Sequence, residues 1–534
     1  MSDALDVANM PWVVRTRATL ERWWDRVDRM VLRLQGRVDT PGYDRGLPYA
    51  FSIVLGALLI LIALARHHSL LLGEDTAKFA QATWQISEGL RPDTTLSGGH
   101  IVAEQGSLIL YPLGLLANIT PDIQMLLIVR ALALAVTIIP LWRLARTHGR
   151  LGIGVSSVVV LAYSLYAAVH AMNASDFAPA TLAVPALMWA VLFGFNDRDR
   201  LTFVASVFVL CCRADLGLVV LGLGILFLLE RKRHLGTVIA LLGLGWFLIS
   251  MYALQPWLGD GGYAFLDAYA AFGDTPLRVL WGIISSPWQF LRTVGSVANF
   301  EVLVSLLAPV LFLPLTAPRY LMPAIPLYVL YMGAEVPAGP LSEAGQTVPI
   351  TVFVFVALVF ALQRAGRTLV KRVRVERRIV LALVLTSIIF FVRDAETSPY
   401  AQPWEWGSRD AADESRLAAI EQLPANEVPV RASGTLLPLL SERLGVFALD
   451  TTTPETLEDK VDASVMRVDW ILLDPAAEPS LSGEDIFAFR SALGRRGWER
   501  IEVGEDSAIE IFRFTGIVAP GQVELLEESV EPDG

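Results

Sequence analysis

The sequence predicts a mainly α-helical, polytopic membrane protein that ends in a small, outward-facing α/β domain. The 534-residue chain is 54% hydrophobic and has a mean hydropathy of +0.50, and soluble proteins of this size are less apolar. Long apolar runs alternate with loops, and clusters of Lys and Arg fall on every second loop, as in the cytoplasmic loops of membrane proteins. Residues 393–534 hold 29 Asp and Glu against 12 Lys and Arg, so an acidic domain follows a basic membrane region.

The first 48 residues are polar and rich in arginine, and we expect them to form a cytoplasmic N-terminal segment. Within it, residues 12–38 repeat apolar side chains at helical spacing with arginines between them, which predicts a basic amphipathic helix. Such a helix suits the anionic inner leaflet, although packing on the protein's own loops remains an equal alternative. The segment is too long for the start of a secretory signal, so residues 51–65 are expected to stay in place as the first span.

Residues 49–392 are expected to form the transmembrane domain, with about eleven spans. Several of the segments are shorter than the roughly 20 residues that cross a bilayer as a helix. The number must be odd, because the N-terminal arginines and the acidic C-terminal domain are expected on opposite sides of the membrane. The predicted spans are 49–65, 122–145, 152–170, 178–194, 201–212, 216–229, 235–255, 302–317, 320–334, 348–363 and 379–392.

The positive charges assign a side to each loop. If the spans alternate as predicted, one side of the membrane receives every arginine-rich segment and is therefore cytoplasmic. Those segments are the N-terminus, Arg143 to Arg150, Arg198 with Arg200, Arg231 to Arg233 and Arg364 to Arg378. The loops 66–121, 171–177 and 256–301, together with the C-terminal domain, then face outward.

Residues 393–519 predict the extracytoplasmic α/β domain, and the acidic residues 520–534 are expected to be disordered. Strand-like segments alternate with helix-like ones in this part of the chain. The strands are expected at 428–432, 446–449 and 468–473, the helices at 436–444 and 486–495, and a final hairpin at 498–503 and 508–514 with its turn at Gly504 to Asp506. Cys211 and Cys212 are adjacent in an apolar run, so they predict neither a disulfide framework nor a metal site.

The first outer loop carries the strongest candidate for chemistry, the pair Glu74 and Asp75. A helical segment over residues 76–88 follows Asp75, and a second apolar piece at 107–117 follows His100, so two short helices on the membrane surface are expected. Asp75 is the candidate catalytic residue, while Glu74 and His100 are candidates for substrate binding. The alternative for Asp75 is a structural one, because Asp is a common helix N-cap.

Charged side chains interrupt later apolar segments. Arg130 lies within a nearly uncharged span, where an arginine costs roughly 2.5–3.5 kcal/mol to insert. It should therefore either snorkel to the outer interface or bind an outer carboxylate or a lipid phosphate. Arg213 and Asp215 fall at the predicted turn between two short helices. Residues two apart do not face each other on a helix, so each is expected to bind another partner, such as Arg130 or Asp176. The further substrate-binding candidates are Arg130, Asp176, Arg213 and Asp215. For Asp176 the alternative is an N-cap for the next span.

The order of motifs resembles the bacterial predicted membrane proteins called domain of unknown function 2079. The first motif, from Asp75 to Gly89, reads DTAKFAQATWQISEG, and the resemblance extends in order over most of the chain. Further matching motifs are Gly99-His100, Leu141 to Arg146, Asp176 to Pro179, Arg213 to Asp215, Ala432 to Arg443 and Asp469 to Asp474. Five positions that are polar in the family pattern are apolar here: Ala80, Ala178, Ala180, Ala214 and Leu439.

The family is similar in layout to the GT-C glycosyltransferases, which implies a function. The resemblance implies that Asp75 acts as a general base for an acceptor hydroxyl, which attacks a sugar held on a polyprenyl phosphate at the outer face of the bacterial plasma membrane. Arg130, Arg213 or His100 would then face the departing phosphate. The implied partners are the bilayer, the polyprenyl-phosphate sugar and an envelope glycan or protein acceptor, with no nucleic acid.

Two alternatives from other classes remain. A catalytically silent scaffold that binds an envelope partner is favoured by the five apolar replacements. A transporter would favour broken helices and repeated halves, which the sequence does not show. The cofactor is unknown: a divalent cation is an option, although the sequence contains no dedicated metal motif.

Overall fold

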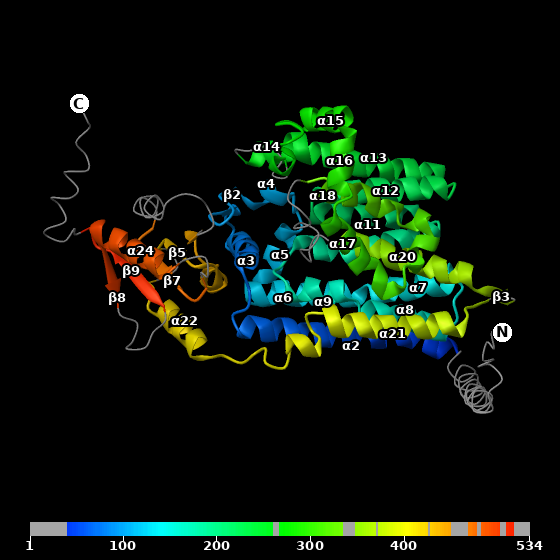
Figure 1. The fold of residues 1–534 in the computed structure, drawn as a ribbon, viewed down its shortest axis with the longest axis horizontal. Helices are drawn as coiled ribbons and strands as arrows, with labels where there is room; N and C mark the ends of the chain where they lie inside the picture. Colours follow the sequence, from blue (N-terminus) through cyan, green and yellow to red (C-terminus); the bar gives the residue numbers. More distant parts are fainter. Residues whose placement is uncertain are drawn as a thin grey trace, which may run out of the picture.

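The computed structural model describes residues 40–259, 266–334, 348–369, 372–424, 428–449, 468–477, 482–501 and 509–516. Three predictions lie outside these residues: the amphipathic helix at 12–38, the hairpin turn at 504–506 and the acidic tail at 520–534. The described part consists of a long helical bundle and a smaller unit built around a sheet (Figure 1). The fold is therefore mainly helical, as the sequence predicts.

Helices occupy each of the predicted spans, but most of them are short. The helices in chain order are α2 (Pro41–His68), α6 (Asp122–Val136), α7 (Ile138–Thr147), α8 (Ile153–Ser164), α9 (Ala167–Ala174), α10 (Ala183–Phe195), α11 (Asp199–Cys212), α12 (Leu216–Leu229), α13 (Arg233–Ile249), α14 (Gln255–Leu258), α17 (Val297–Leu307), α18 (Ile325–Met332), α20 (Val348–Ala365) and α21 (Arg377–Asp394). A turn of π-helix, η3 (Ser250–Leu254), joins α13 to α14.

Four helical stretches in the described residues are long and apolar enough to cross a membrane. They are α2, Asp122–Thr147, Ile153–Ala174 and Arg233–Leu258. A fifth is possible if the bent pair Pro287–Val294 and Val297–Val310 forms one span. Eleven spans are therefore not confirmed. The 48° bend also supplies a broken helix, a feature that the sequence analysis did not expect.

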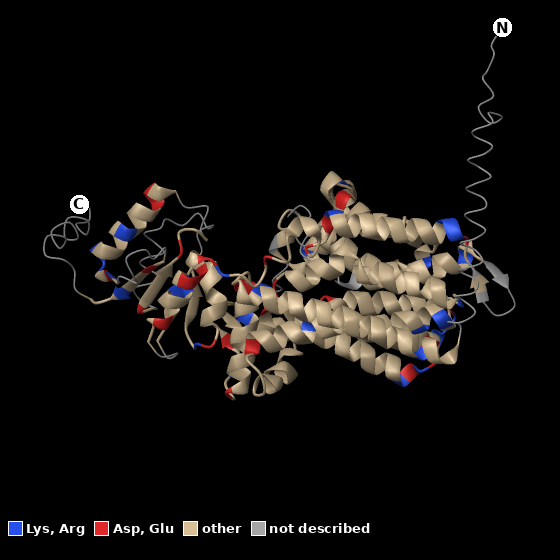
Figure 2. Cartoon of the chain, turned by 90° about the horizontal axis from the view of Figure 1, so that it is seen from below, with Lys and Arg blue, Asp and Glu red and all other residues tan. Residues whose placement is uncertain are grey.

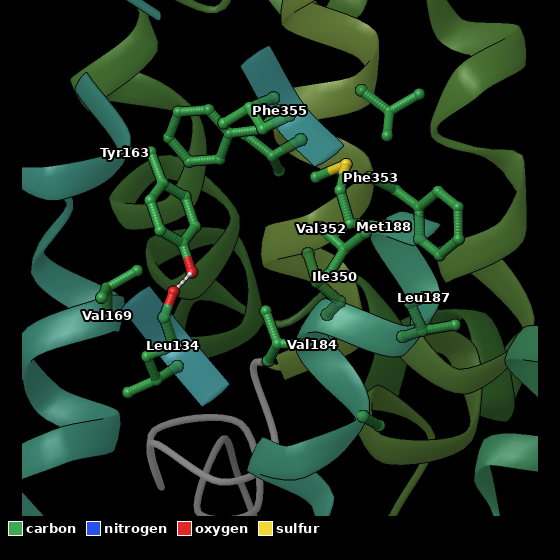
Figure 3. Packing of buried hydrophobic residues seen from close by; sticks show 14 of the residues in the cluster. Leu134, Tyr163, Val169, Val184, Leu187, Met188, Ile350, Val352, Phe353 and Phe355 are labelled. Atoms are coloured by element: carbon green, nitrogen blue, oxygen red, sulfur yellow. Dashed lines mark hydrogen bonds between the residues drawn. The ribbon is translucent and has the colours of Figure 1, made fainter. Parts of the chain in front are cut away.

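The bundle is held together by close contacts between small residues and by a buried aromatic core. Helices α12 and α13 pack so tightly that a Cβ at Gly224 would lie 2.3 Å from the backbone nitrogen of Ala240, an approach that only glycine allows. Elsewhere the Tyr163 hydroxyl donates to the Leu134 carbonyl oxygen at 2.9 Å and the Tyr163 ring packs edge-on against Phe355 of α20 (Figure 3). Such internal hydrogen bonds are needed because lipid offers no partner to a buried polar group.

Lys and Arg gather at the end of the bundle remote from the sheet, where the short hairpin of β3 (Arg367–Leu369) and β4 (Arg372–Arg374) also lies (Figures 1 and 2). At that end Arg146 binds both carboxylate oxygens of Asp44, and Trp142 donates to the same carboxylate. The positive-inside rule predicts that this end is cytoplasmic.

The C-terminal unit is a five-stranded mixed sheet in the order β6-β5-β7-β9-β8. Strands β6 (Val446–Ala448), β5 (Val430–Ala432) and β7 (Trp470–Leu473) are parallel, while β9 (Glu510–Phe514) runs antiparallel to β7 and to β8 (Trp498–Ile501). Helix α22 (Ala411–Glu421) and the 3-10 helix η11 (Gly434–Leu440) cover one face, and α24 (Gly483–Arg495) covers the other. The predicted strands are thus present, and the helix predicted over 436–444 is instead a 3-10 helix with Pro438 inside it.

Helix α3 (Glu74–Ser87) lies between the two parts and is mostly buried, apart from its first two residues. Ala77 of α3 is buried in the same apolar cluster as Val430 and Leu436 of the sheet unit. Gln81, one turn later and fully buried, donates from Nε2 to the Arg443 carbonyl oxygen at 2.9 Å. The C-terminal unit therefore packs directly on the helix that begins with Glu74 and Asp75.

Candidate functional site

The N-terminus of α3 is fixed by a carboxylate from another part of the chain. Asp176, in the loop after α9, accepts hydrogen bonds at Oδ1 from the Gly73 backbone N–H (2.7 Å) and the Thr76 hydroxyl (2.9 Å). Thr76 in turn accepts from the Phe177 N–H at 3.0 Å. Asp176 thus places its negative charge at the start of α3, where such a charge is favourable. The alternative, that Asp176 caps the next helix, is wrong, because the N-cap of the 3-10 helix η2 (Pro179–Leu182) is Ala178.

Because Asp176 serves the start of α3, Asp75 is not its N-cap. Helix α3 begins at Glu74, after Gly73, so that Asp75 is its second residue. The Asp75 side chain is 59% exposed and binds Lys78, with 2.7 Å between Oδ1 and Nζ. Glu74 is exposed beside it. The structural alternative for Asp75 is therefore wrong, and both acids of the predicted pair are open to the surroundings.

Lys78 connects Asp75 to a third acid that the sequence analysis did not single out. Its ammonium lies 2.6 Å from Oε1 of Glu104, which belongs to the short helix α4 (Ile101–Gln105). Burial lowers the pKa of Lys78, but the charges and hydrogen bonds of Glu104 and Asp75 outweigh burial and raise it. Lys78 therefore remains a cation held between two carboxylates. Its spacing of three residues from Asp75 on a helix was a signal for the first contact, whereas no sequence signal pointed to Glu104.

Backbone hydrogen bonds connect α4 and the residues after it to the turn that carries Arg213 and Asp215. The Ala214 N–H donates to the Gln105 carbonyl oxygen at 2.9 Å, and the Ile109 N–H donates to the Cys211 carbonyl oxygen at 2.9 Å. As predicted, Arg213 and Asp215 lie at the turn between α11 and α12. The expectation that they bind different partners is wrong, because Arg213 is extended rather than helical and its Nε donates to Asp215 Oδ1 at 2.6 Å.

Tyr331 of α18 completes this second cluster. Its hydroxyl donates to Asp215 Oδ2, and the Arg213 guanidinium lies 5.7 Å from the centre of its ring. Arg213 and Asp215 are both buried, so their charges are paired within the protein as burial requires. The two clusters, Asp75-Lys78-Glu104 and Arg213-Asp215-Tyr331, are therefore linked through the backbone of α4. Tyr331 lies in an apolar run without a distinguishing pattern, so its part in the cluster was not predictable from the sequence.

Arg130 lies apart from both clusters and holds the end of a helix. Its Nη2 donates to the Asn173 carbonyl oxygen at 2.5 Å, and its Nη1 donates to the Ser175 and Asp176 carbonyl oxygens at 2.7 and 3.0 Å. These carbonyl groups close the C-terminus of α9, where a cation is favourable. The side chain is buried, so it does not snorkel to the interface. Arg130 thereby fixes the loop from which Asp176 reaches α3.

His100 is buried at the start of α4 and serves as its N-cap. Its Nδ1 accepts from the Val102 N–H at 3.2 Å, and its Nε2 lies 3.4 Å from the Tyr111 hydroxyl. Burial lowers the pKa of His100, with opposing effects from Asp93 and Arg91. His100 is accordingly neutral near pH 7 and suited to hydrogen bonding rather than to charge neutralisation.

Within the described residues, no group of three or more His, Cys, Asp and Glu side chains could hold a metal ion.

Comparisons with known proteins agree with this layout. The family model described as "Predicted membrane protein (DUF2079)" matches residues 66–492. Among solved structures, the chain is similar to ArnT from Cupriavidus metallidurans bound to undecaprenyl phosphate, with 12% identity and a TM-score of 0.52 over 88% of this chain and 99% of that chain. The apo state of the same ArnT gives 13% identity and a TM-score of 0.49 over 86% and 97%. No curated protein matches the chain. At 12% identity, the likeness to bound ArnT shows a shared fold.

Proposed function

The chain belongs to the DUF2079 family of predicted membrane proteins, and we propose that it is a GT-C-type glycosyltransferase. It transfers a sugar from a polyprenyl-phosphate donor to an acceptor, an envelope glycan or protein, on the outer face of a bacterial plasma membrane. Asp75 is the general base. The observation that carries the proposal is the exposed Asp75 carboxylate at the start of α3, in a chain that shares the fold of ArnT.

The chemistry follows from the charges around Asp75. The acceptor hydroxyl attacks the anomeric carbon, a new C–O bond forms there, and the bond from that carbon to the phosphate oxygen breaks. The hydroxyl proton passes to Asp75, which must be ionised to accept it. The polyprenyl phosphate leaves as an anion, and cations placed around its oxygens stabilise the charge. Arg213 is proposed for that contact, since its turn is attached to α4 next to Glu104.

The other candidate residues support the site in different ways. Glu74 lies next to Asp75, and His100 caps the start of α4. Both are proposed to bind the sugar or the acceptor by hydrogen bonds. Asp215 holds Arg213 in place. Asp176 and Arg130 position α3, because Asp176 binds the start of this helix and Arg130 binds the backbone that carries Asp176. This division makes Arg130 a positioning residue rather than a phosphate ligand.

A silent scaffold is the second candidate, and two observations favour it. Asp75 is already paired with Lys78, and a base that must accept a proton gains little from a bound cation. The family-pattern positions Ala80 and Ala214 are also apolar and buried. In this alternative the sheet unit packed on α3 binds an envelope partner, and no lipid carrier is needed.

Carrier binding separates the two candidates. The purified full chain is mixed in detergent with undecaprenyl phosphate, with undecaprenol or with phosphatidylglycerol, and native mass spectrometry counts the bound lipid. An enzyme should retain undecaprenyl phosphate in preference to both others, since it recognises the phosphate and the long chain together. Arg213→Gln should weaken that preference. Arg319→Gln should not, because Arg319 binds Glu230 at the end of α12 opposite to Asp215. Equal retention of all three lipids would favour the scaffold.

A further inference from the structure

Two short helices in the predicted outer loop 256–301 present an apolar face that no part of the described chain covers. They are α15 (Pro276–Ser285) and α16 (Pro287–Val294). Trp281 is 70% exposed and Trp288 is 77% exposed. Leu277, Leu280, Ile284 and Leu291 are exposed as well. The α15 members recur at intervals of three and four residues and therefore lie on one side of the helix.

The opposite side of this hairpin has its own small core, which fixes the direction of the apolar face. Val279 of α15 is buried with Phe272 and Tyr269, and Phe290 of α16 packs on the same cluster. The rings of Phe272 and Phe290 meet edge to face, with their centres 5.9 Å apart. Since one side of the pair is already packed, the tryptophan side must face whatever surrounds the protein.

The length of the helices decides how they can meet the bilayer. Ten and eight residues give helices of roughly 15 and 12 Å, while the hydrocarbon layer is about 30 Å thick. Neither helix can span it. However, α16 leads directly into α17, whose Val297 and Phe300 are also exposed, and the two form the bent pair with the composition of a membrane span. The apolar face is therefore continuous with a surface expected to lie in lipid.

Polar groups border the face on one side, as at a membrane interface. An open cavity of about 490 Å³ is bordered by both helices and by residues 271–273, and its lining includes Arg278, Ser285 and Gln289 beside Trp281. Arg278 binds Asp274 through both carboxylate oxygens, at 2.8 and 2.7 Å. Tryptophan next to arginine and other polar groups is typical of the boundary between headgroups and acyl chains.

We propose that the α15–α16 hairpin is an interfacial anchor that inserts Trp281 and Trp288 into one leaflet of the bilayer. The leaflet is the one on the side of α3, because α14, the helix that precedes the hairpin, packs on α4: Gln255 donates to the Glu104 carbonyl oxygen at 3.2 Å. The partner is thus a lipid surface, with acyl chains around the indoles and headgroups around Arg278. This inference does not depend on the proposed enzyme activity.

Photo-crosslinking tests the anchor in the full chain. Trp281, Trp288, Phe487 and Leu241 are replaced one at a time by p-benzoylphenylalanine, and the protein is irradiated in nanodiscs of phosphatidylethanolamine and phosphatidylglycerol. Phe487 is the matched negative control, because it is 69% exposed on α24 of the sheet unit, and Leu241 is the positive control, because it is exposed on the candidate span of α13. All four positions are exposed, so folding should be preserved.

Mass spectrometry of the irradiated protein gives the result. The anchor predicts lipid adducts at positions 281 and 288 near the level at 241, and roughly tenfold above the level at 487, because the indoles lie at the acyl boundary. Adduct levels at 281 and 288 as low as at 487 would overturn the proposal. Crosslinks from 281 or 288 to a second copy of the chain would overturn it too, since the face would then be a protein interface.

Discussion

Replacing Lys78 with Met tests whether the cluster around Asp75 is held by charge. Methionine keeps most of the aliphatic stem, so the principal loss is the ammonium that contacts Asp75 at 2.7 Å and Glu104 at 2.6 Å. The Asp75 contact is 59% exposed on the acid side, and such a pair is worth only ~0.5 kcal/mol. The Glu104 side chain is more buried and would be left beside a second carboxylate, which costs about 1.5 kcal/mol more.

The expected loss of unfolding free energy for Lys78→Met is therefore about 2 kcal/mol at neutral pH. Glu104→Gln removes one acid and should reduce the cost of losing Lys78, so the double variant should show a coupling of about 1 kcal/mol. Unfolding is followed by SDS titration in mixed micelles. The raised pKa of Lys78 adds a pH test: its stabilisation is complete below the ordinary value of 10.5 and is lost as the pH rises above it. Strictly additive losses would show that the ion pair does not form.

Three further predictions concern the supports of the site. Arg130→Lys should cost about 2 kcal/mol of unfolding free energy, because one ammonium cannot reach all three carbonyl groups that the guanidinium binds. An unchanged SDS unfolding midpoint would contradict the role of Arg130 in holding the C-terminus of α9. Gln81→Ala should speed hydrogen exchange in β6 by loosening the sheet unit from α3, by an amount equal to about 1 kcal/mol, and equal exchange in both proteins would exclude that contact. Since burial lowers the pKa of His100, the wild-type protein should lose stability as the pH falls below 6.5; His100→Asn, which keeps a capping side chain, should show a weaker dependence between pH 5 and 7.

Local patterns predicted much of the fold. Apolar runs located helices such as α2 and α13, and short strand-like segments located β5 and β7, because each pattern reflects the burial of one element. The order of motifs from Asp75 to Asp474 identified the family, and the family match confirms it. The number of spans was not predictable in the same way, because α11 and α12 are 14 residues each, too short to span by length alone.

The site depended on contacts that sequence spacing does not contain. Asp176 reaches Gly73 across 103 positions, and Lys78 reaches Glu104 across 26. Helix spacing wrongly separated Arg213 from Asp215, because the rule applies only inside a helix and Arg213 is extended. Arg130 was recognised as costly in a span, but its partners are backbone carbonyls, which no residue type in the sequence marks.

Sugar transfer by the Asp75→Asn variant tests the central claim most directly. Membranes that contain the wild-type chain or a variant are supplied with polyprenyl-phosphate sugars carrying a radiolabel, and loss of label from the lipid fraction is followed. Asp75→Asn should transfer sugar about 10²–10⁴-fold more slowly, the usual contribution of a general base. Its unfolding free energy should fall by only ~0.5 kcal/mol, the value of the exposed pair with Lys78. Glu88→Gln, an exposed acid at the other end of α3, should match the wild type. Transfer by Asp75→Asn at the wild-type rate would contradict the assignment of Asp75 as the base.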